Sequence, residues 1–381
     1  MSTRKIAIEE ELLLTDPETG RLVAGSSRAV QARTAETKDG VHDIEQELFE
    51  PQLETATQPF TVLGDLLDDV CRCRVVAAQG AEHAGAVLAA VAAPVLDEET
   101  LAPTRNARYQ RIVDGFGLTS RQAVVCGMHV HVDIDGDEEG VAVLDRLRPW
   151  LPVLLALSAN SPFGWGHDSG HASWRSQVWN RWPTAGPSEP FGDVAGYRAA
   201  SDALIGSGAA FDAGMLYFDA RLAASFPTVE VRVADVCTEV DDAVLIAALC
   251  RGLVETAAAQ WRAGEPVPVW RSDLLRAAHW RAGRFGLSGL LLDPVGQDLA
   301  PARQVVDALL AHVAAALTDA GDAEWVRAAY ERLVARGSGA SRQRAVAEAN
   351  GWGRGGGSDP ENGAALLAVV IDLQQRTRVS P

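Results

Sequence analysis

Alternating apolar and polar residues predict four extended segments in this chain. Successive side chains of a β-strand point to opposite faces, so a strand with one buried face shows a period of two residues. The predicted strands are Ile6–Thr15, Leu48–Thr57, Ala123–Asp133 and Pro227–Ala234. Proline and glycine interrupt the pattern at residues 16–20, directly after the first strand, and indicate a β-hairpin there.

Leu, Val and Ala at helical spacing predict the remaining elements. The predicted helices are Thr61–Ala93, Glu138–Ala159, Asp241–Arg262 and Arg303–Arg336. Residues 160–190 are rich in Gly, Pro, Ser and Trp and predict a long loop. Strands that come first, with helices interspersed, indicate a single α+β domain over residues 1–350. We interpret residues 351–381 as a Gly-rich linker followed by a C-terminal helical segment.

Composition excludes several classes of function. With 47% hydrophobic residues among 381, the chain can bury a large core. Its formal net charge of -17 argues against nucleic acid or an anionic membrane as a partner, because either would be repelled. There is no signal-peptide pattern, and the most apolar stretch, 150–158, is too short to cross a bilayer. The five cysteines form no C-x-x-C pair, so we expect reduced thiols and a cytoplasmic protein.

Three of the predicted strands carry their ionisable side chains on the face opposite to their apolar side chains. These are Glu9 and Glu11 in the first strand, His129, His131 and Asp133 in the third, and Glu230 and Arg232 in the fourth. Such faces, if they adjoin, would form the floor of a cleft for hard cations and an anionic ligand. Magnesium prefers carboxylate oxygens and leaves part of its shell to water and phosphates.

Spacing alone leaves alternatives open for each motif. The acidic run at residues 9–11 is either a solvated edge strand or a metal site. His129 and His131 are either polar positions beside the core or a metal pair. Glu230 and Arg232 are either a surface ion pair, which is the commoner case, or part of a catalytic site.

Several longer motifs occur in a fixed order. They are I-x-I-E-E-E-L-L-L-T-D-P-E-T-G from residue 6, E-L-F-E-P-Q-L-E-T-A-T from 47, Arg108-Tyr109, C-G-M-H-V-H-V from 126, S-A-N-S-P-F from 158, S-W-R-S-Q-V-W-N-R-W-P-T-A-G-P from 173, P-T-V-E-V-R-V-A-D-V-C from 227 and A-R-G-S-G-A from 335. In order and spacing they resemble the glutamate-cysteine ligase type 2 family, also called carboxylate-amine ligases, which is related in fold and chemistry to glutamine synthetase.

The resemblance implies a fold and an activity. The expected fold is a glutamine synthetase-like catalytic domain, in which a mainly antiparallel curved sheet has a polar active-site face and helices packed on the other. The expected activity is ATP-dependent amide formation between a carboxylate, that of glutamate, and an amine. ATP and two or three Mg²⁺ ions, for which Mn²⁺ could substitute, are the implied cofactors. A homodimer is the implied assembly, and the identity of the amine stays open.

The resemblance also assigns roles to residues. Metal binding is implied for Glu9, Glu11, Glu47, Glu54, His129 and Glu230. Arg232 matches the arginine that neutralises phosphate charge, and with Glu230 it forms the implied catalytic pair. His131 is expected beside the nucleotide, and Arg175 is expected to hold the amino-acid substrate.

Two other functions compete with this assignment. One is a zinc-dependent hydrolase that uses His129 and His131, with His167, His171 or His279 as a further ligand. The predominance of glutamate and the absence of an H-E-x-x-H sequence count against it. The other is a nucleotide-binding relative without turnover. The tryptophans of the 160–190 segment, Trp165, Trp174, Trp179 and Trp182, form either a substrate lid or a packed aromatic loop.

Overall fold

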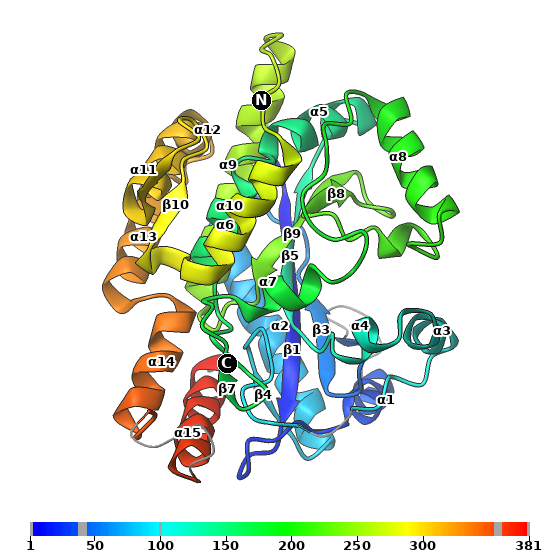
Figure 1. The fold of residues 1–381 in the computed structure, drawn as a ribbon, viewed down its shortest axis with the longest axis vertical. Coiled ribbons are helices and arrows are strands. Elements are labelled where there is room, and N and C mark those ends of the chain that lie inside the picture. Colours follow the sequence, from blue (N-terminus) through cyan, green and yellow to red (C-terminus); the bar gives the residue numbers. More distant parts are fainter. Residues whose placement is uncertain (1–2, 37–43, 99–100, 354–359, 379–381) are drawn as a thin grey trace.

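The computed structural model describes residues 3–36, 44–98, 101–353 and 360–378 (Figure 1). Seven strands within these ranges form one antiparallel sheet in the order β2-β3-β1-β5-β9-β8, and β4 also pairs with β1. The strands are β1 (Ile6–Thr15), β2 (Ile44–Gln46), β3 (Gln52–Ala56), β4 (Val87–Ala89), β5 (Gly127–Asp133), β8 (Ala220–Leu222) and β9 (Thr228–Asp235). Two short hairpins, β6 (Phe163–Gly164) with β7 (His167–Asp168) and β10 (Leu290–Leu292) with β11 (Leu299–Pro301), lie outside it.

One face of the sheet is apolar and is covered by helices. Ile6 and Ile8 of β1, Val130 of β5 and Val231 of β9 belong to one buried cluster with side chains of these helices. The helices are α2 (Leu63–His83), α5 (Asp137–Leu147), α6 (Leu151–Ser158) and α9 (Val240–Arg262). Because apolar side chains occupy every second position of the central strands, burying this face leaves the other face to the polar residues.

Further helices surround this core. Packed outside α6 and α9 are α10 (Ser272–Phe285), α11 (Ala302–His312), α12 (Ala314–Asp319) and α13 (Ala323–Arg336), with the short helix η2 (Gly286–Ser288). The remaining elements before α9 are α3 (Ala107–Phe116), α4 (Leu118–Arg121), α7 (Trp174–Trp179), which packs on α10 and β9, α8 (Val194–Gly206), which packs on α5, and the short helix η1 (Ala213–Met215). Near the ends of the chain are α1 (Ser26–Glu36), which packs on α2, and α14 (Gly339–Ala349) with α15 (Pro360–Thr377).

The predicted α+β class and the mainly antiparallel sheet with one polar face are confirmed. The strands predicted at Leu48–Thr57 and Ala123–Asp133 are shorter than expected, since β3 begins at Gln52 and β5 at Gly127. None of the helices in the described part of the chain has the length and hydropathy that crossing a bilayer would require.

The helix predicted over Thr61–Ala93 is wrong in its last third. It ends at His83, and Gly85 then adopts a left-handed conformation with φ of 71°. The following alanine-rich residues form β4, which pairs with β1 and is largely buried. Pairing with the central strand therefore overrides the helical preference of alanine in this segment.

Other predicted helices are divided. The segment Glu138–Ala159 contains α5 and α6, which are separated by residues 148–150, and Arg303–Arg336 contains three helices. The predicted loop at 160–190 contains the β6–β7 hairpin and α7, whose N-cap Ser173 accepts a hydrogen bond from the Ser176 N–H. A capped helix this short could not be recognised from apolar spacing.

The C-terminal helix α15 packs against α14 and β4. Leu366, Val369 and Leu373 are buried in the same cluster as the β1 leucines. The side chain of Gln374 donates hydrogen bonds to the Thr15 hydroxyl and the Asp16 carbonyl, both at 3.0 Å. Residues 354–359 of the predicted linker lie outside the described residues, and the division of the chain at residue 350 stays a prediction.

One charged residue of β1 points to the apolar side. Glu10 accepts two hydrogen bonds from the guanidinium of Arg74 on α2, at 2.6 and 2.9 Å, and both side chains are almost completely buried. Arg74 also donates to the carbonyl oxygens of Cys237 and Thr238, each at 2.6 Å. This buried ion pair ties α2 to β1 and to the end of β9, whereas Glu9 and Glu11 remain on the polar face.

Replacing Arg74 with methionine should lower the free energy of unfolding by about 3–5 kcal/mol, because Glu10 would be left charged and unpaired in the core. Urea denaturation followed by circular dichroism measures this change. The matched control is Arg303→Met, which removes the exposed pair Arg303–Glu331, with side chains 55% and 54% accessible. It should cost about 0–1 kcal/mol. Equal effects of the two substitutions would contradict the role given to Arg74.

Candidate active site

The polar face of the sheet forms the floor of a cavity of about 330 Å³. Eight of the nine residues predicted for the site line it: Glu9, Glu11, Glu47, Glu54, His129, His131, Glu230 and Arg232. The strand register explains why they converge. Glu9 lies opposite His129, Glu11 lies opposite Glu54, and His131 lies opposite Glu230. Directly opposite residues share a face with their Cβ atoms about 5 Å apart, so β1, β3, β5 and β9 deliver seven of these side chains to one place, and Glu47 follows directly after β2.

The acidic and imidazole groups form two clusters. The first cluster is Glu9, His131 and Glu230, and the second cluster is Glu11, Glu47 and Glu54. Within each cluster, the potential ligand atoms lie within 4.8 Å of one another. Such spacing allows a single cation to be held by all three side chains of a cluster.

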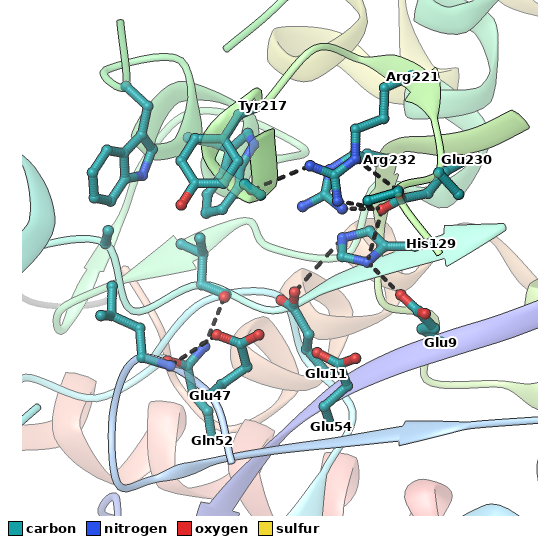
Figure 2. Close-up of a pocket in the computed structure, with 18 of the residues that line it drawn as sticks. Glu9, Glu11, Glu47, Gln52, Glu54, His129, Tyr217, Arg221, Glu230 and Arg232 are labelled. Carbon is teal, nitrogen blue, oxygen red and sulfur yellow. Dashed lines mark hydrogen bonds and ion pairs between the residues drawn. The ribbon is translucent and has the colours of Figure 1, made fainter. Parts of the chain in front are cut away.

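His129 lies between the two clusters (Figure 2). Its Nδ1 is 3.1 Å from Glu9 Oε2 and 3.9 Å from Glu230 Oε1, and its Nε2 is 3.6 Å from Glu11 Oε1. Burial and the nearby charge of Arg232 lower the pKa of His129, which favours the neutral imidazole that can bind a metal. The Nε2 atoms of His129 and His131 are buried without a well-oriented hydrogen-bond partner.

Positive groups compensate the first cluster. Burial alone would raise the pKa of Glu9, but the hydrogen bond from His129 and the nearby ring of His131, 3.2 Å away, hold it below its ordinary value. Burial also opposes ionisation of Glu230, yet Arg232 and Arg221 lower its pKa to about 2. Arg221 donates to Glu230 Oε2 at 2.7 Å, and Arg232 donates to Glu230 Oε1. Glu9 and Glu230 are therefore carboxylates at neutral pH.

The second cluster has weaker compensation, in which His129 Nε2 lies 3.6 Å from Glu11 Oε1. Burial, followed by the charges of Glu47, Glu9 and Glu11, raises the pKa of Glu54 well above its usual value. One oxygen of Glu11 accepts a hydrogen bond from the Gly127 N–H at 2.6 Å, and Glu47 Oε2 accepts one from the Leu48 N–H at 2.8 Å. Three ionised carboxyl groups this close together would repel one another unless a cation joins them. An all-oxygen donor set of this kind suits Mg²⁺ or Mn²⁺.

Arg175 does not line this cavity. Its buried guanidinium donates to the Arg232 and Val233 carbonyls, at 3.2 and 3.4 Å, and lies 3.9 Å from the carboxylate of Asp235. These contacts support the backbone of β9 behind Arg232. A contact between Arg175 and substrate stays a prediction that the position of this side chain does not favour.

The predicted tryptophan lid is divided between two places. Trp179 and Trp182 line the cavity, whereas Trp165 and Trp174 lie at a separate surface pocket. Trp182 is buried against Phe116 and Tyr217, with ring centroids 5.2 and 5.4 Å apart. Two of the four rings thus belong to the wall of the cavity.

Other residues also line the cavity, and the sequence patterns did not indicate them. They include Tyr217, Arg221 and Phe226, and also Gln52 and Tyr109, which occur in the family-like motifs without an implied role. Arg221 lies on the three-residue strand β8, opposite Glu230, and three residues are too few to show a period. The only indication in the sequence was that this positively charged residue shortly precedes the alternating strand β9.

The histidines proposed as further zinc ligands lie elsewhere. His279 is 3.2 Å from Asp219, His171 contacts the Ser169 carbonyl, and His167 is exposed on β7. Within the described residues, none of the three belongs to a cluster with metal-ligand spacing.

Gly127, at the start of β5, separates the cavity from Arg175. A Cβ atom at this position would lie 2.2 Å from Arg175 Nη2 and 2.8 Å from its Cζ, which is too close for any side chain. The Gly127 N–H also holds Glu11 in the second cluster. A side chain at this position would therefore have to displace the Arg175 guanidinium.

Gly127→Ala should displace the Arg175 guanidinium and lower the free energy of unfolding by about 1–3 kcal/mol, as overpacked substitutions do. Gly64→Ala on α2 is the matched control, because a Cβ atom there meets nothing within 4 Å. The control should leave stability unchanged or raise it by up to about 1 kcal/mol. Chemical denaturation of both variants measures the difference, and an unchanged stability for Gly127→Ala would refute the steric argument.

Comparisons with known proteins extend over nearly the whole chain. The model of glutamate-cysteine ligase family 2 matches residues 6–361. A protein of Nocardioides sp. with the provisional name glutamate–cysteine ligase 2-1 is 50% identical over 383 residues, which cover 99% of this chain and 97% of that protein. A protein of Streptomyces avermitilis with the same provisional name is also 50% identical, over 91% of this chain and 96% of its own length.

Solved structures resemble the fold at low sequence identity. A glutamate–cysteine ligase from Francisella tularensis, in complex with AMP, has a TM-score of 0.68 at 12% identity and covers 100% of this chain and 90% of its own. A bifunctional glutathione synthetase from Pasteurella multocida has a TM-score of 0.65 at 15% identity, and the match covers 98% of this chain but only 52% of that longer protein. These likenesses concern the arrangement of the elements.

Proposed function

The chain belongs to glutamate-cysteine ligase family 2, and on this basis we propose that it is an ATP-dependent ligase that joins a carboxylate to an amine. Glutamate is the proposed carboxylate, since the relatives are named for it. The observation that carries the proposal is the convergence of five glutamates, two histidines and Arg232 on one cavity. The proposed cofactors are ATP and Mg²⁺, for which Mn²⁺ could substitute.

The proposed reaction has two steps. In the first, an oxygen of the substrate carboxylate forms a bond to the γ-phosphorus of ATP, and the bond to the bridging oxygen breaks, so that ADP leaves with the electron pair. In the second, the amine nitrogen attacks the carbonyl carbon of the acyl phosphate. The C–O bond to phosphate breaks, phosphate leaves with those electrons, and the nitrogen gives up a proton to water. The products are an amide, ADP and phosphate.

Charge repulsion is the main obstacle to the first step, because a carboxylate must approach a triphosphate. Divalent cations bound to the phosphates would neutralise much of the negative charge. The first cluster, with His129, and the second cluster are the proposed cation sites. The two clusters would hold two ions. Within the described residues, no further group of side chains has the spacing to hold a third ion.

Arg232 is the proposed stabiliser of the transferred phosphoryl group. Its guanidinium is held in a fixed orientation by Glu230, and it keeps its positive charge because the neighbouring carboxylates favour ionisation. A preorganised cation of this kind stabilises charge that develops in the transition state without further reorganisation. His131 lies at the same end of the cavity, where it is proposed to contact the nucleotide, and its Nδ1 is 2.9 Å from the Thr228 hydroxyl.

The two competing functions predict different measurements. A zinc hydrolase would contain stoichiometric zinc after gentle purification and would turn over substrate without ATP. A relative without turnover would bind ATP but release no ADP with any pair of carboxylate and amine. The cytoplasmic location and the homodimer remain expectations from the resemblance to the family.

Glu230→Gln should reduce ADP release by ~100-fold or more, since the variant loses a ligand of the first cluster and the partner of Arg232. ADP release is measured with Mg²⁺, ATP, glutamate and a panel of amines. Glu331→Gln, on the exposed surface of α13, is the control and should retain full activity. Normal ADP release by a correctly folded Glu230→Gln variant would show that the assignment is wrong.

Glu54→Gln should weaken one Mn²⁺ site by at least ~10-fold and leave the other unchanged, because only the second cluster loses a ligand. Calorimetric titration of the free protein with Mn²⁺ measures this without any turnover. Glu45 lies opposite Glu54 on β2 but is exposed and does not line the cavity, so Glu45→Gln serves as the control. Two unaltered Mn²⁺ sites in Glu54→Gln would remove the second cluster from the proposal.

A further inference from the structure

The lining of the cavity combines charged and apolar side chains. Beside the carboxylates, imidazoles and Arg232 there is a region of mainly aromatic and aliphatic side chains, and Arg108 and Arg221 are also part of the lining. We call the mainly aromatic and aliphatic region the aromatic chamber and define it by Tyr109, Ile112, Ala123, Val125, Trp179, Trp182 and Tyr217. In Figure 2, Tyr217 lies on the opposite side of the cavity from Glu54 and well away from Glu9. The proposed phosphoryl transfer makes use of the charged region only.

The walls of the chamber support one another. The ring centroids of Trp179 and Tyr217 are 4.8 Å apart, and those of Trp179 and Trp182 are 6.3 Å apart. Trp182 also packs on Phe116, which belongs to a buried cluster separate from the two main cores. Rings that are fixed from behind in this way hold the chamber open and give it a defined shape.

Two buried polar atoms of the wall lack a partner. The indole N–H of Trp182 and the side-chain oxygen of Gln52 make no hydrogen bond, although both residues are at least nine-tenths buried and line the cavity. The amide nitrogen of Gln52 is held at 2.9 Å by the Val125 carbonyl, so its oxygen is fixed in position. Buried polar groups are normally paired, and each of these two atoms has less than 1 Å² of accessible surface, so they mark unsatisfied positions in the wall and not groups that open into the cavity.

Acidic residues adjoin the aromatic chamber. Glu47 and Glu54 line the cavity beside Tyr109, and burial together with the charges of these two carboxyl groups raises the pKa of the Tyr109 hydroxyl. The amine that attacks the acyl phosphate must be unprotonated, so we expect its nitrogen to point toward the charged region and the rest of the molecule to lie among the rings. A dicarboxylic substrate such as glutamate gains nothing from apolar walls.

We propose that the aromatic chamber binds the amine substrate and selects amines that carry an apolar or aromatic group. This inference rests on the proposed ligase function. A small polar side chain would leave the chamber partly unfilled and its walls in contact with water. In a closed apolar pocket, each additional buried methylene group changes the specificity constant by ~10-fold or more.

The first experiment compares amines at saturating ATP, Mg²⁺ and glutamate. The panel contains L-alanine, L-serine, L-cysteine, L-leucine, L-phenylalanine and phenethylamine, and both ADP and the amide product are quantified. We expect kcat/KM for L-leucine and L-phenylalanine to exceed that for L-alanine and L-serine by ~100-fold. ADP and amide formation with equal or better use of L-alanine, L-serine or L-cysteine would overturn this inference and leave the ligase function intact. No ADP with any amine or alternative carboxylate would overturn both.

The second experiment changes the size of the chamber. Ala123→Leu adds apolar bulk to its wall and should lower the ratio of kcat/KM for L-phenylalanine to that for L-alanine by ~10-fold, whereas Val125→Ala enlarges it and should not lower this ratio. The ratio is read within one variant, so partial loss of folded protein does not affect it. The KM for ATP should stay unchanged in both, and Val269→Ala on the exposed surface is the control. An unchanged amine preference in Ala123→Leu would place the amine elsewhere.

Discussion

The antiparallel register of β1 with β3 and β5 is the constraint on which the rest of the site depends. It places Glu11 opposite Glu54 and Glu9 opposite His129. Like charges in directly opposite positions destabilise a sheet. Interactions on the polar face, such as Glu11 opposite Glu54, therefore do not stabilise this register. The buried apolar face supplies the opposing force, because a shift by one residue would turn the isoleucines and valines away from α9 and toward the cavity.

The two clusters resolve this repulsion in different ways. Arginine and histidine side chains balance the first cluster within the protein, and the low pKa of Glu230 follows from them. The second cluster accepts backbone hydrogen bonds and has His129 3.6 Å from Glu11, and burial together with the charges of the neighbouring glutamates raises the pKa of Glu54. A cation would therefore change the local electrostatics more in the second cluster than in the first. The sheet thus holds one cluster that is already balanced and one that a bound cation would complete.

The sequence reveals those parts of the site that lie on long strands. Alternation alone separates Glu9 and Glu11 from Glu10, and the structure places Glu10 in a buried ion pair with Arg74. Glu47 and Glu54 could be assigned only through the resemblance to a family, since no period in their own segment indicates a shared cavity. Neither alternation nor the resemblance to the family indicated a role for Arg221 or Gln52, because their positions depend on how short strands and irregular segments meet in space. The same limitation explains the error in the helix predicted over Thr61–Ala93, because the alanine-rich residues at its end pair with β1 and form β4.

The helix α7 connects the charged region of the cavity with the aromatic chamber. It carries Arg175, which holds the backbone of β9 at Arg232, and Trp179, which forms part of the aromatic chamber. Behind it, the buried carboxylate of Asp235 accepts hydrogen bonds from Ser161 and Ser173, at 2.8 and 2.7 Å, and so anchors the start of α7 to β9. A displacement of this helix would move the phosphate-facing arginine and the wall of the chamber together. The absence of a side chain at Gly127 allows that connection, because it leaves the space through which Arg175 reaches the strand.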